Sequence, residues 1–516
     1  MRVIWRHPGA LVAMTAWALA SGCAGAYPLV QVEQTNGRPA VHYRLADQEA
    51  ADQARTLVAR ALGDTGSVFK IEAGSDPAGF SVLLAADQRA NMYPLVAPLG
   101  EGRWLVHAPT LLPGCLRSDQ IGGVAADGSV VEHVCDPEGY VWLGVAGSGA
   151  EAQVAGPHTS SLRGVLADAN LGVLQDLEAR LGPSGARSAA IAVVVHEDAP
   201  ASLVAHVARD GAVIFEARPG FEPLITEEVA RTQIRPLLRH EAFHRWNMAG
   251  AAADGTVPAW VYEGTAEYVG GLLSLHAGDF SALEHDWVLS QALNQCREAL
   301  GGTLLADAAE NRRTNYDCGR AAAWLLDLDL RRQGADIFAF WRSLLAEARQ
   351  STGEYSYVQW RGTLDQHGWE TPALDDFLSQ GATDGLAGVI NARGGRIVLE
   401  PSPHDLRRAI LEPLLAANCT SDSYGFFDEP GRATLDADTV CPALPAQAVL
   451  HSVAGVSLFD DPAAALEAAQ ARCAGEQEIT VGLAASESVR LRCSPISSPA
   501  GSFQVQDSGV GPEAAS

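Results

Sequence analysis

Residues 240–244 read His-Glu-Ala-Phe-His, and a further glutamate, Glu263, follows after eighteen intervening residues. On a helix, residues four apart lie on one face, so His240 and His244 can reach one ion while Glu241 projects beside it. A catalytic zinc site takes three protein ligands and leaves one position for water. The metal lowers the pKa of that water to about 7, and the glutamate of H-E-x-x-H takes its proton. The pattern predicts one Zn²⁺ per chain, with His240, His244 and Glu263 as ligands and Glu241 as the general base.

The residues around this motif favour two helices. Apolar side chains at helical spacing predict a helix over 227–248, which Pro236 either kinks or restarts. Glycine and proline then indicate a loop over 251–258. A second helix is expected over 260–275, with Glu263 in its first turn, where a carboxylate complements the helix dipole. The bland alternative is two ordinary amphipathic helices with surface Glu and His.

Two further details concern the third ligand and its surroundings. Glu267 lies one turn after Glu263 on the same face, where it can accept a hydrogen bond from a ligand histidine and fix its tautomer. The metzincin pattern H-E-x-x-H-x-x-G-x-x-H is not met, because Asn247 stands at the glycine and Gly250 at the third histidine. Asp254 is an alternative third ligand, but Glu263 fits better.

The motif residues resemble a known family. The run H-E-A-F-H-R-W-N at 240–247 resembles the H-E-x-F-H-x-W-N signature of the glycyl aminopeptidase family, one of the gluzincin zinc metallopeptidases. The run W-V-Y-E-G-T-A-E-Y at 260–268 is similar to the gluzincin segment that carries the third ligand. Tyr316 begins Y-D-C-G, which resembles the family's Y-x-K-G. The resemblance covers about 190–380 and implies a peptidase in which Tyr316 donates a hydrogen bond to the oxyanion; a tyrosine that only caps the next helix is the alternative.

The chain departs from the family at three points. The spacing between His244 and Glu263 is closer to that of aminopeptidase N, and Cys318 replaces the lysine of Y-x-K-G. The family segment that holds the amino terminus of the substrate has only a weak counterpart, G-F-E-P at 220–223, whose carboxylate is Glu222. Glu222 is therefore the candidate for a substrate amine, and aminopeptidase and endopeptidase activity both stay open.

Length and charge limit the partners. With 516 residues the chain has room for three or so domains. A net charge of -26 argues against nucleic acid, whose phosphates must be neutralised by lysine and arginine. We therefore expect a peptide or protein substrate.

The amino terminus has the features of an export signal. The apolar stretch 9–20 follows a positive start and is too short to span a bilayer. The residues L-A-S-G-C resemble a lipobox, which predicts a signal peptide over 1–22 and a membrane anchor through lipid on Cys23. The A-G-A at 24–26 is an alternative cleavage site that would release a soluble protein. We expect a bacterial cell envelope lipoprotein at the outer membrane or periplasmic face, or else a soluble periplasmic or secreted protein.

The other eight cysteines support export. They fall as sequential neighbours, separated by 20, 22, 22 and 20 positions. Four local disulfides in an oxidising compartment are the simplest interpretation, although connectivity is not deducible from sequence and eight reduced thiols are the alternative. The expected pairs are Cys115–Cys135, Cys296–Cys318, Cys419–Cys441 and Cys473–Cys493.

The texture of the chain predicts an α+β protein of several domains. Residues 27–150 alternate short apolar runs with turn residues and predict a β-rich N-terminal domain. Helical patterns dominate 161–384, the expected zinc metallopeptidase domain of gluzincin type. Residues 385–494 predict a small α+β module that resembles the second half of a PDZ domain or is of unspecified type. Residues 495–516, rich in Ser, Gly and Pro, are expected to be a disordered tail.

Two functions are compatible with these patterns. The first is a zinc-dependent peptidase of the cell envelope that hydrolyses peptide bonds through a metal-activated water, with Glu241 as general base. The alternative is a non-catalytic binding or assembly lipoprotein on a metallopeptidase fold. The enzyme is favoured by the intact set of His240, Glu241, His244, Glu263 and Tyr316. In a protein that had lost its catalytic activity, at least one of these residues would be expected to be replaced.

Overall fold

The computed structural model describes residues 29–35, 38–44, 47–63, 69–73, 77–84, 89–90, 93–94, 96–100, 103–107, 121–124, 130–133, 140–143, 154–157, 159–186, 190–195, 203–207, 211–217, 220–351, 353–420, 425–429, 432–436, 439–483 and 487–509. These residues form two compact units. Unit 1 holds the described residues up to 281 together with 322–371, and unit 2 holds 282–321 together with 372–509.

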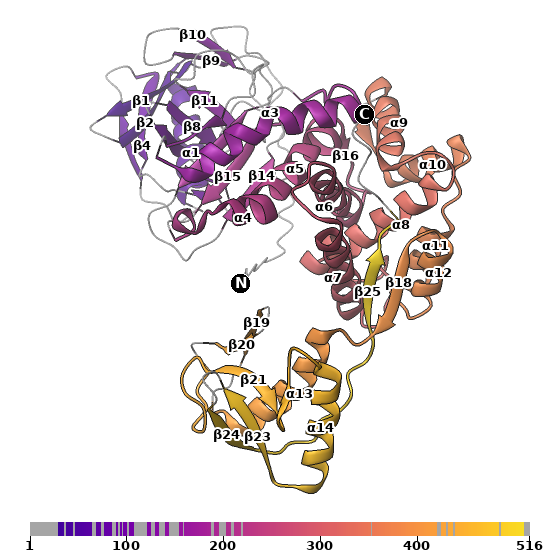
Figure 1. Ribbon diagram of the computed structural model, residues 1–516. Helices are drawn as coiled ribbons and strands as arrows, with labels where there is room; N and C mark the ends of the chain where they lie inside the picture. Colours follow the sequence, from indigo (N-terminus) through magenta and orange to yellow (C-terminus); the bar gives the residue numbers. More distant parts are fainter. Residues whose placement is uncertain are drawn as a thin grey trace. The chain divides into compact units, whose positions relative to one another are not determined.

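The first part of unit 1 is rich in strands (Figure 1). One sheet has the order β10-β9-β1-β2-β4-β3, made by Val130–His133, Ile121–Val124, Leu29–Thr35, Arg38–Arg44, Gly79–Leu84 and Phe69–Ala73. A second has the order β11-β8-β7, made by Tyr140–Leu143, Arg103–His107 and Val96–Gly100. The short strands β5 (Arg89–Ala90) and β6 (Tyr93–Pro94) pair with each other. Helix α1 (Gln48–Gly63) packs on β3 and β4. The β-rich N-terminal part that the sequence predicted therefore contains sheets and one helix.

A four-stranded sheet precedes the helices of unit 1. Its order is β12-β13-β15-β14, made by Val154–Ala155, Ile191–Val195, Val213–Ala217 and Leu203–Val207. The first three strands are parallel, and β14 runs antiparallel to β15 at the edge. Strands β13 and β15 are nearly continuous apolar runs, as expected of strands buried on both faces. Helix α3 (Ser161–Leu181), capped by Ser160, packs on β12.

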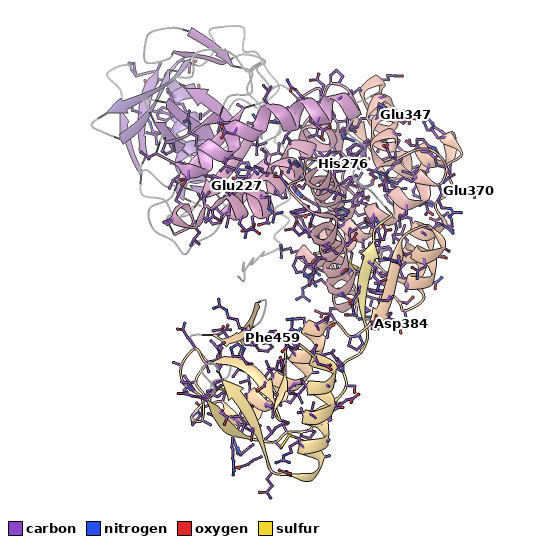
Figure 2. The ribbon with its side chains drawn as sticks, viewed as in Figure 1. Glu227, His276, Glu347, Glu370, Asp384 and Phe459 are labelled. Atoms are coloured by element: carbon purple, nitrogen blue, oxygen red, sulfur yellow. A yellow bond between two sulfur atoms is a disulfide. The ribbon has the colours of Figure 1, made fainter. Side chains whose placement is uncertain are left out.

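Helices form the rest of unit 1. Pro236 stands in the first turn of α5, and the helical backbone continues into it from Ile234 and Arg235, so Pro236 does not start a separate helix. The elements in chain order are η1 (Glu222–Leu224), α4 (Glu227–Val229), η2 (Ala230–Ile234), α5 (Arg235–His244), η3 (Arg245–Ala249), β16 (Ala252–Ala253), α6 (Ala259–His276), α8 (Gly319–Arg331, in unit 1 from Ala322), α9 (Ile337–Gln350), β17 (Glu354–Tyr355) and α10 (Tyr357–His367). Glu227, at the start of α4, is labelled in Figure 2.

Unit 2 begins with helices and ends with a strand that returns to them. Its first part contains α7 (Ala282–Leu300), η4 (Arg313–Cys318), α11 (Pro372–Gln380), α12 (Leu386–Ala392) and β18 (Arg396–Glu400). The last strand, β25 (Ser502–Asp507), pairs antiparallel with β18. The prediction of a disordered tail over 495–516 is therefore wrong for 495–509, because Phe503 and Val505 alternate with polar residues and are buried. Residues 510–516 lie outside the described residues.

An α+β module lies between β18 and β25. Its strands form the order β19-β20-β21-β23-β24, with β22 paired to β21, and every neighbouring pair is antiparallel. The elements are α13 (Pro403–Asn418), β19 (Phe426–Glu429), β20 (Arg432–Leu435), β21 (Val449–Val453), β22 (Val456–Ser457), α14 (Pro462–Gly475), β23 (Glu478–Leu483) and β24 (Ser488–Arg492). Phe459, labelled in Figure 2, lies 4.8 Å beneath the Arg407 guanidinium. The structure confirms mixed helices and strands in this part of the chain, while a PDZ-like domain and a domain start at 385 stay predictions.

The cysteine prediction is confirmed where the structure describes the residues. Disulfides join Cys296–Cys318, Cys419–Cys441 and Cys473–Cys493. Cys23, Cys115 and Cys135 lie outside the described residues, so the lipid anchor and the fourth disulfide stay predictions. Within the described part of the chain, no helix combines the length and the apolarity that a bilayer span needs.

Candidate metal centre

Helices α5 and α6 carry the predicted ligands and pack closely on each other. Gly270 makes this approach possible: a Cβ at this position would lie 3.0 Å from the Pro236 carbonyl oxygen and 3.2 Å from the His240 nitrogen. Arg239, next to the first ligand, pairs with Asp279 beyond the end of α6 at 2.6 Å. Backbone contact and a buried ion pair therefore set the position of α5 against α6.

The three ligand atoms converge between these helices. The Nε2 atoms of His240 and His244 lie 3.0 Å apart. Glu263 Oε2 lies 3.4 Å from the first and 3.2 Å from the second. Tetrahedral zinc bonds of about 2.0–2.1 Å place neighbouring ligand atoms about 3.3 Å apart. His240, His244 and Glu263 therefore form a group that can hold one metal ion.

The electrostatics of the group favour a positive charge. Burial raises the pKa of the Glu241 carboxyl to about 8. Burial alone would lower the pKa of His244, but the Glu263 carboxylate outweighs it and the pKa is raised to about 9. Burial also acts to raise the pKa of Glu263, yet His244 and His240 hold it well below its ordinary value. A half-buried carboxylate between two buried imidazoles thus attracts a cation, which fits a metal with nitrogen and oxygen ligands.

Asn247 determines the tautomer of His244. Its Nδ2 donates to the Tyr262 carbonyl oxygen at 3.1 Å, so its Oδ1 is left to face His244 Nδ1 at 2.9 Å. The hydrogen of that imidazole must then lie on Nδ1, which leaves the Nε2 lone pair for a metal. Asn247 is 0% exposed, and the Tyr355 hydroxyl donates to its carbonyl oxygen at 2.9 Å. The sequence showed Asn247 only as part of a motif, and its position three residues after His244 was the signal for this role.

Glu267 lies on the Nδ1 side of the other ligand. Its Oε1 is 3.6 Å from His240 Nδ1, which is longer than a hydrogen bond. The face predicted for Glu267 is therefore observed, while its role in orienting His240 stays a prediction.

Two other predicted site residues are Tyr316 and Glu222. Tyr316 is half-buried in η4, which belongs to unit 2, whereas the metal ligands belong to unit 1. Its role at an oxyanion stays a prediction. Glu222 accepts hydrogen bonds from Ser160 Oγ at 2.5 Å and from Ser161 N at 2.9 Å, at the first turn of α3. A carboxylate at a helix N-terminus is a stabilising contact, so these bonds give Glu222 a structural role, while its role as a contact for a substrate amine stays a prediction.

A strand at the edge of its sheet lies beside the helix that carries His240 and His244. Strand β14 contacts α5, and in the described parts of the chain no strand pairs with its outer edge. The main chain of such an edge can bind an extended peptide by adding it to the sheet. The sequence analysis did not predict a strand over Leu203–Val207. Its position at the edge of the sheet is known only from the strand order.

Comparison with known proteins bears on this geometry. No protein-family model matches the sequence, and no curated protein matches it. Among solved structures, an aminopeptidase N family protein from Idiomarina loihiensis aligns over 94% of this chain and 99% of its own, with 11% identity and a TM-score of 0.53. The chain shares this fold. The gluzincin resemblance is thereby confirmed for the fold, while closeness to the glycyl aminopeptidases stays a prediction.

Two further solved structures are more distant. An M1 zinc metallopeptidase from Deinococcus radiodurans has a TM-score of 0.28 and 15% identity, covering 61% of this chain and 60% of its own. Native leukotriene A4 hydrolase from Saccharomyces cerevisiae has a TM-score of 0.39 and 10% identity, covering 76% of this chain and 71% of its own. At these TM-scores neither supports an argument about this chain.

Proposed function

We propose that the protein is a zinc-dependent peptidase. The observation that carries this proposal is the convergence of His240, His244 and Glu263 on one point, with the buried Glu241 on the same helix as the two histidines. Zinc held there would lower the pKa of a water molecule and polarise a substrate carbonyl. A peptidase fold without chemistry would have no need for this complete set of residues.

The residues of the chain have distinct roles in the proposed reaction. Glu241 accepts the proton of the attacking water and passes it to the leaving amine. Asn247 keeps His244 in the tautomer that a metal needs. The hydroxyl of Tyr316, by its resemblance to the family's tyrosine, donates to the oxyanion, a contact that contributes roughly a hundredfold or more in rate.

The substrate we propose is a peptide in extended conformation. The outer edge of β14, which pairs with no strand among the described residues and lies beside α5, supports this, because its main chain can pair with the substrate backbone whatever the side chains are. We further propose that the protein acts in the bacterial cell envelope, attached through Cys23 or released as a soluble protein. The predicted export signal and the disulfides that the structure describes support that location.

The test is Glu241→Gln, which keeps the size of the side chain and the metal ligands but removes the base. Peptidase activity on a diverse peptide library should fall by at least about a hundredfold, with zinc content unchanged and the melting temperature not lowered. Glu228→Gln, the same change on the exposed face of α4, is the control and should keep full activity. If the wild type loaded with zinc cleaves no peptide, the binding or assembly function replaces this proposal.

A further inference from the structure

The strand at the end of unit 2 is bound on both of its edges. Strand β25 pairs with β18 along one edge. Along the other, its main chain is held by side chains of α7 that recur about once per helical turn. We call these residues the polar stripe of α7: Asp286, Ser290, Asn294 and Arg297.

Asn294 is the centre of the stripe and substitutes for a neighbouring strand. Its Nδ2 donates to the Phe503 carbonyl oxygen at 2.9 Å, and its Oδ1 accepts from Phe503 N at 2.8 Å. Ser290 Oγ accepts from Val505 N at 2.9 Å, two residues further along the strand. Every second residue of the strand thus meets about every fourth residue of the helix, so the two repeats match along their length. These bonds fix the position of α7 against β25.

The ends of the stripe bind β25 as well. Asp286 Oδ1 accepts from Ser508 N at 3.0 Å. Arg297 donates to the Gly501 carbonyl oxygen at 2.6 Å and lies 4.9 Å over the Phe503 ring. The contacts therefore extend along the whole strand and reach almost to the end of α7.

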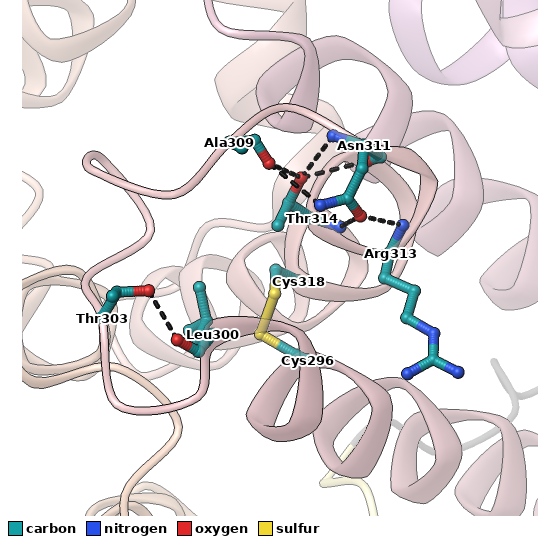
Figure 3. Close-up of a disulfide and its surroundings, with 8 residues drawn as sticks. All are labelled: Cys296, Leu300, Thr303, Ala309, Asn311, Arg313, Thr314 and Cys318. Atoms are coloured by element: carbon teal, nitrogen blue, oxygen red, sulfur yellow. Dashed lines mark hydrogen bonds between the residues drawn. A yellow bond between two sulfur atoms is a disulfide. The ribbon is translucent and has the colours of Figure 1, made fainter. Parts of the chain in front are cut away.

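The same helix is bonded covalently to the segment that carries Tyr316. Cys296, two residues after Asn294, forms a disulfide with Cys318, and both cysteines are 0% exposed (Figure 3). Helix α7 also packs along η4, in which Tyr316 precedes Cys318 by two residues. A shift of α7 is therefore transmitted to the backbone of Tyr316.

The other end of η4 is held by its own hydrogen bonds. Asn311 Oδ1 accepts from Arg313 N at 2.9 Å, and Thr314 Oγ1 accepts from Asn311 N at 2.9 Å (Figure 3). These bonds join only neighbouring residues at the start of η4. The contacts that hold η4 within unit 2 are therefore the disulfide and the packing on α7.

We propose that β25 is a positioning element for Tyr316, acting through the polar stripe of α7 and the Cys296–Cys318 disulfide. This inference rests on the proposed function, in which Tyr316 donates to the oxyanion. Because an oxyanion donor must be placed to within a fraction of an ångström, loosening α7 lowers turnover more than substrate binding. The α+β module lies in the chain between β18 and β25, so both of its ends connect to this pair of strands.

The chain offers a matched pair of variants. Asn418 on α13 holds Arg492 of β24 through two bonds of the same kind, at 2.9 and 2.8 Å, within the α+β module. In Asn294→Ala, hydrogen exchange of 311–318 should become faster and kcat should fall by about tenfold, with KM within about twofold and zinc content unchanged. Asn418→Ala should change neither the exchange of 311–318 nor kcat. Tyr316→Phe gives the full loss for comparison.

Three results would overturn the proposal. The first is wild-type exchange of 311–318 in Asn294→Ala, and the second is an equal loss of kcat in both asparagine variants, which would indicate general destabilisation. The third is wild-type kcat in Tyr316→Phe, which removes the residue to be positioned. The Glu241→Gln experiment does not depend on Tyr316, so failure of this inference and failure of the peptidase proposal give different results. If Asn294→Ala does not fold, Ser290→Ala removes a single bond of the same stripe and is judged by the same readouts.

Discussion

Asn247 shows how one buried amide can prepare a metal ligand. Its two ends face groups of different kind, a carbonyl acceptor at Tyr262 and a ring nitrogen of His244. The amide therefore has one favourable orientation, and that orientation dictates where the imidazole hydrogen lies.

We predict that Asn247→Ala weakens zinc binding by about 10–100-fold, the usual effect of removing the partner of a ligand histidine. The affinity should be measured by competition with a coloured chelator. Asn247→Asp can still accept from His244 but cannot donate to Tyr262, so it should fall between the wild type and Asn247→Ala. Equal affinity in all three proteins would contradict this role.

Asp317, next to Tyr316, provides a pH-dependent prediction. Burial raises its pKa to about 6, although Arg312 and Arg313 act to lower it. A raised pKa means that the folded state holds the proton more tightly than the unfolded state. Stability from this residue is therefore present below about pH 4 and is lost as the pH rises through about 6.

Asp317→Asn should remove that loss. The variant should be more stable than the wild type by about 2 kcal/mol at pH 7 and nearly equal to it at pH 4, since one pKa unit corresponds to about 1.4 kcal/mol. Denaturant unfolding at the two pH values measures the difference. If the difference in stability between the variant and the wild type is the same at pH 7 and at pH 4, Asp317 is not the cause.

At the scale of elements, the metal centre depends on how closely two helices approach. Gly270 lets α6 lie against the backbone of α5 at the first ligand. The atoms that an added Cβ would meet belong to the backbone, so they can move only if the whole of α5 moves.

Gly270→Ala should therefore weaken zinc binding and destabilise the protein by about 1–3 kcal/mol, as overpacking usually does. Gly362→Ala in α10 is the control, because a Cβ added there would have no packing neighbour within 4 Å. Alanine is the better helix former by about 1 kcal/mol, so the control should be neutral or stabilising. Opposite signs for the two glycines would confirm that contact between the helices, and not helix propensity, determines the site.

At the scale of the molecule, zinc should stabilise the fold that holds it. The ligands come from two helices, so an unfolded chain cannot present them together. We predict about one zinc per chain and a melting temperature that falls by about 5 °C or more on chelation, because a ligand that binds only the folded state stabilises it. His244→Ala should melt at the same temperature with and without chelator. A wild-type protein that is equally insensitive to chelator would contradict the metal assignment.

The sequence by itself indicated the candidate metal ligands and the helices that carry them, and it suggested, as the simplest pairing, the three disulfides that the structure describes. These features are local: H-E-x-x-H places its residues by the helix repeat alone, and each pair of cysteines is separated by 20 or 22 residues. It also indicated the β-rich start, the helical centre and the mixed module, since periodicity is a property of short windows.

Only the tertiary structure decided where distant segments meet. The sequence predicted Ser502–Asp507 to be part of a disordered tail, yet this strand binds the polar stripe of α7 across roughly two hundred residues. Glu222 likewise, which the sequence suggested as a contact for a substrate amine, accepts a hydrogen bond from Ser160 at the start of α3, sixty-two residues before it. Hydrogen bonds of this range follow from the packing of whole elements, and no short pattern of residues encodes them.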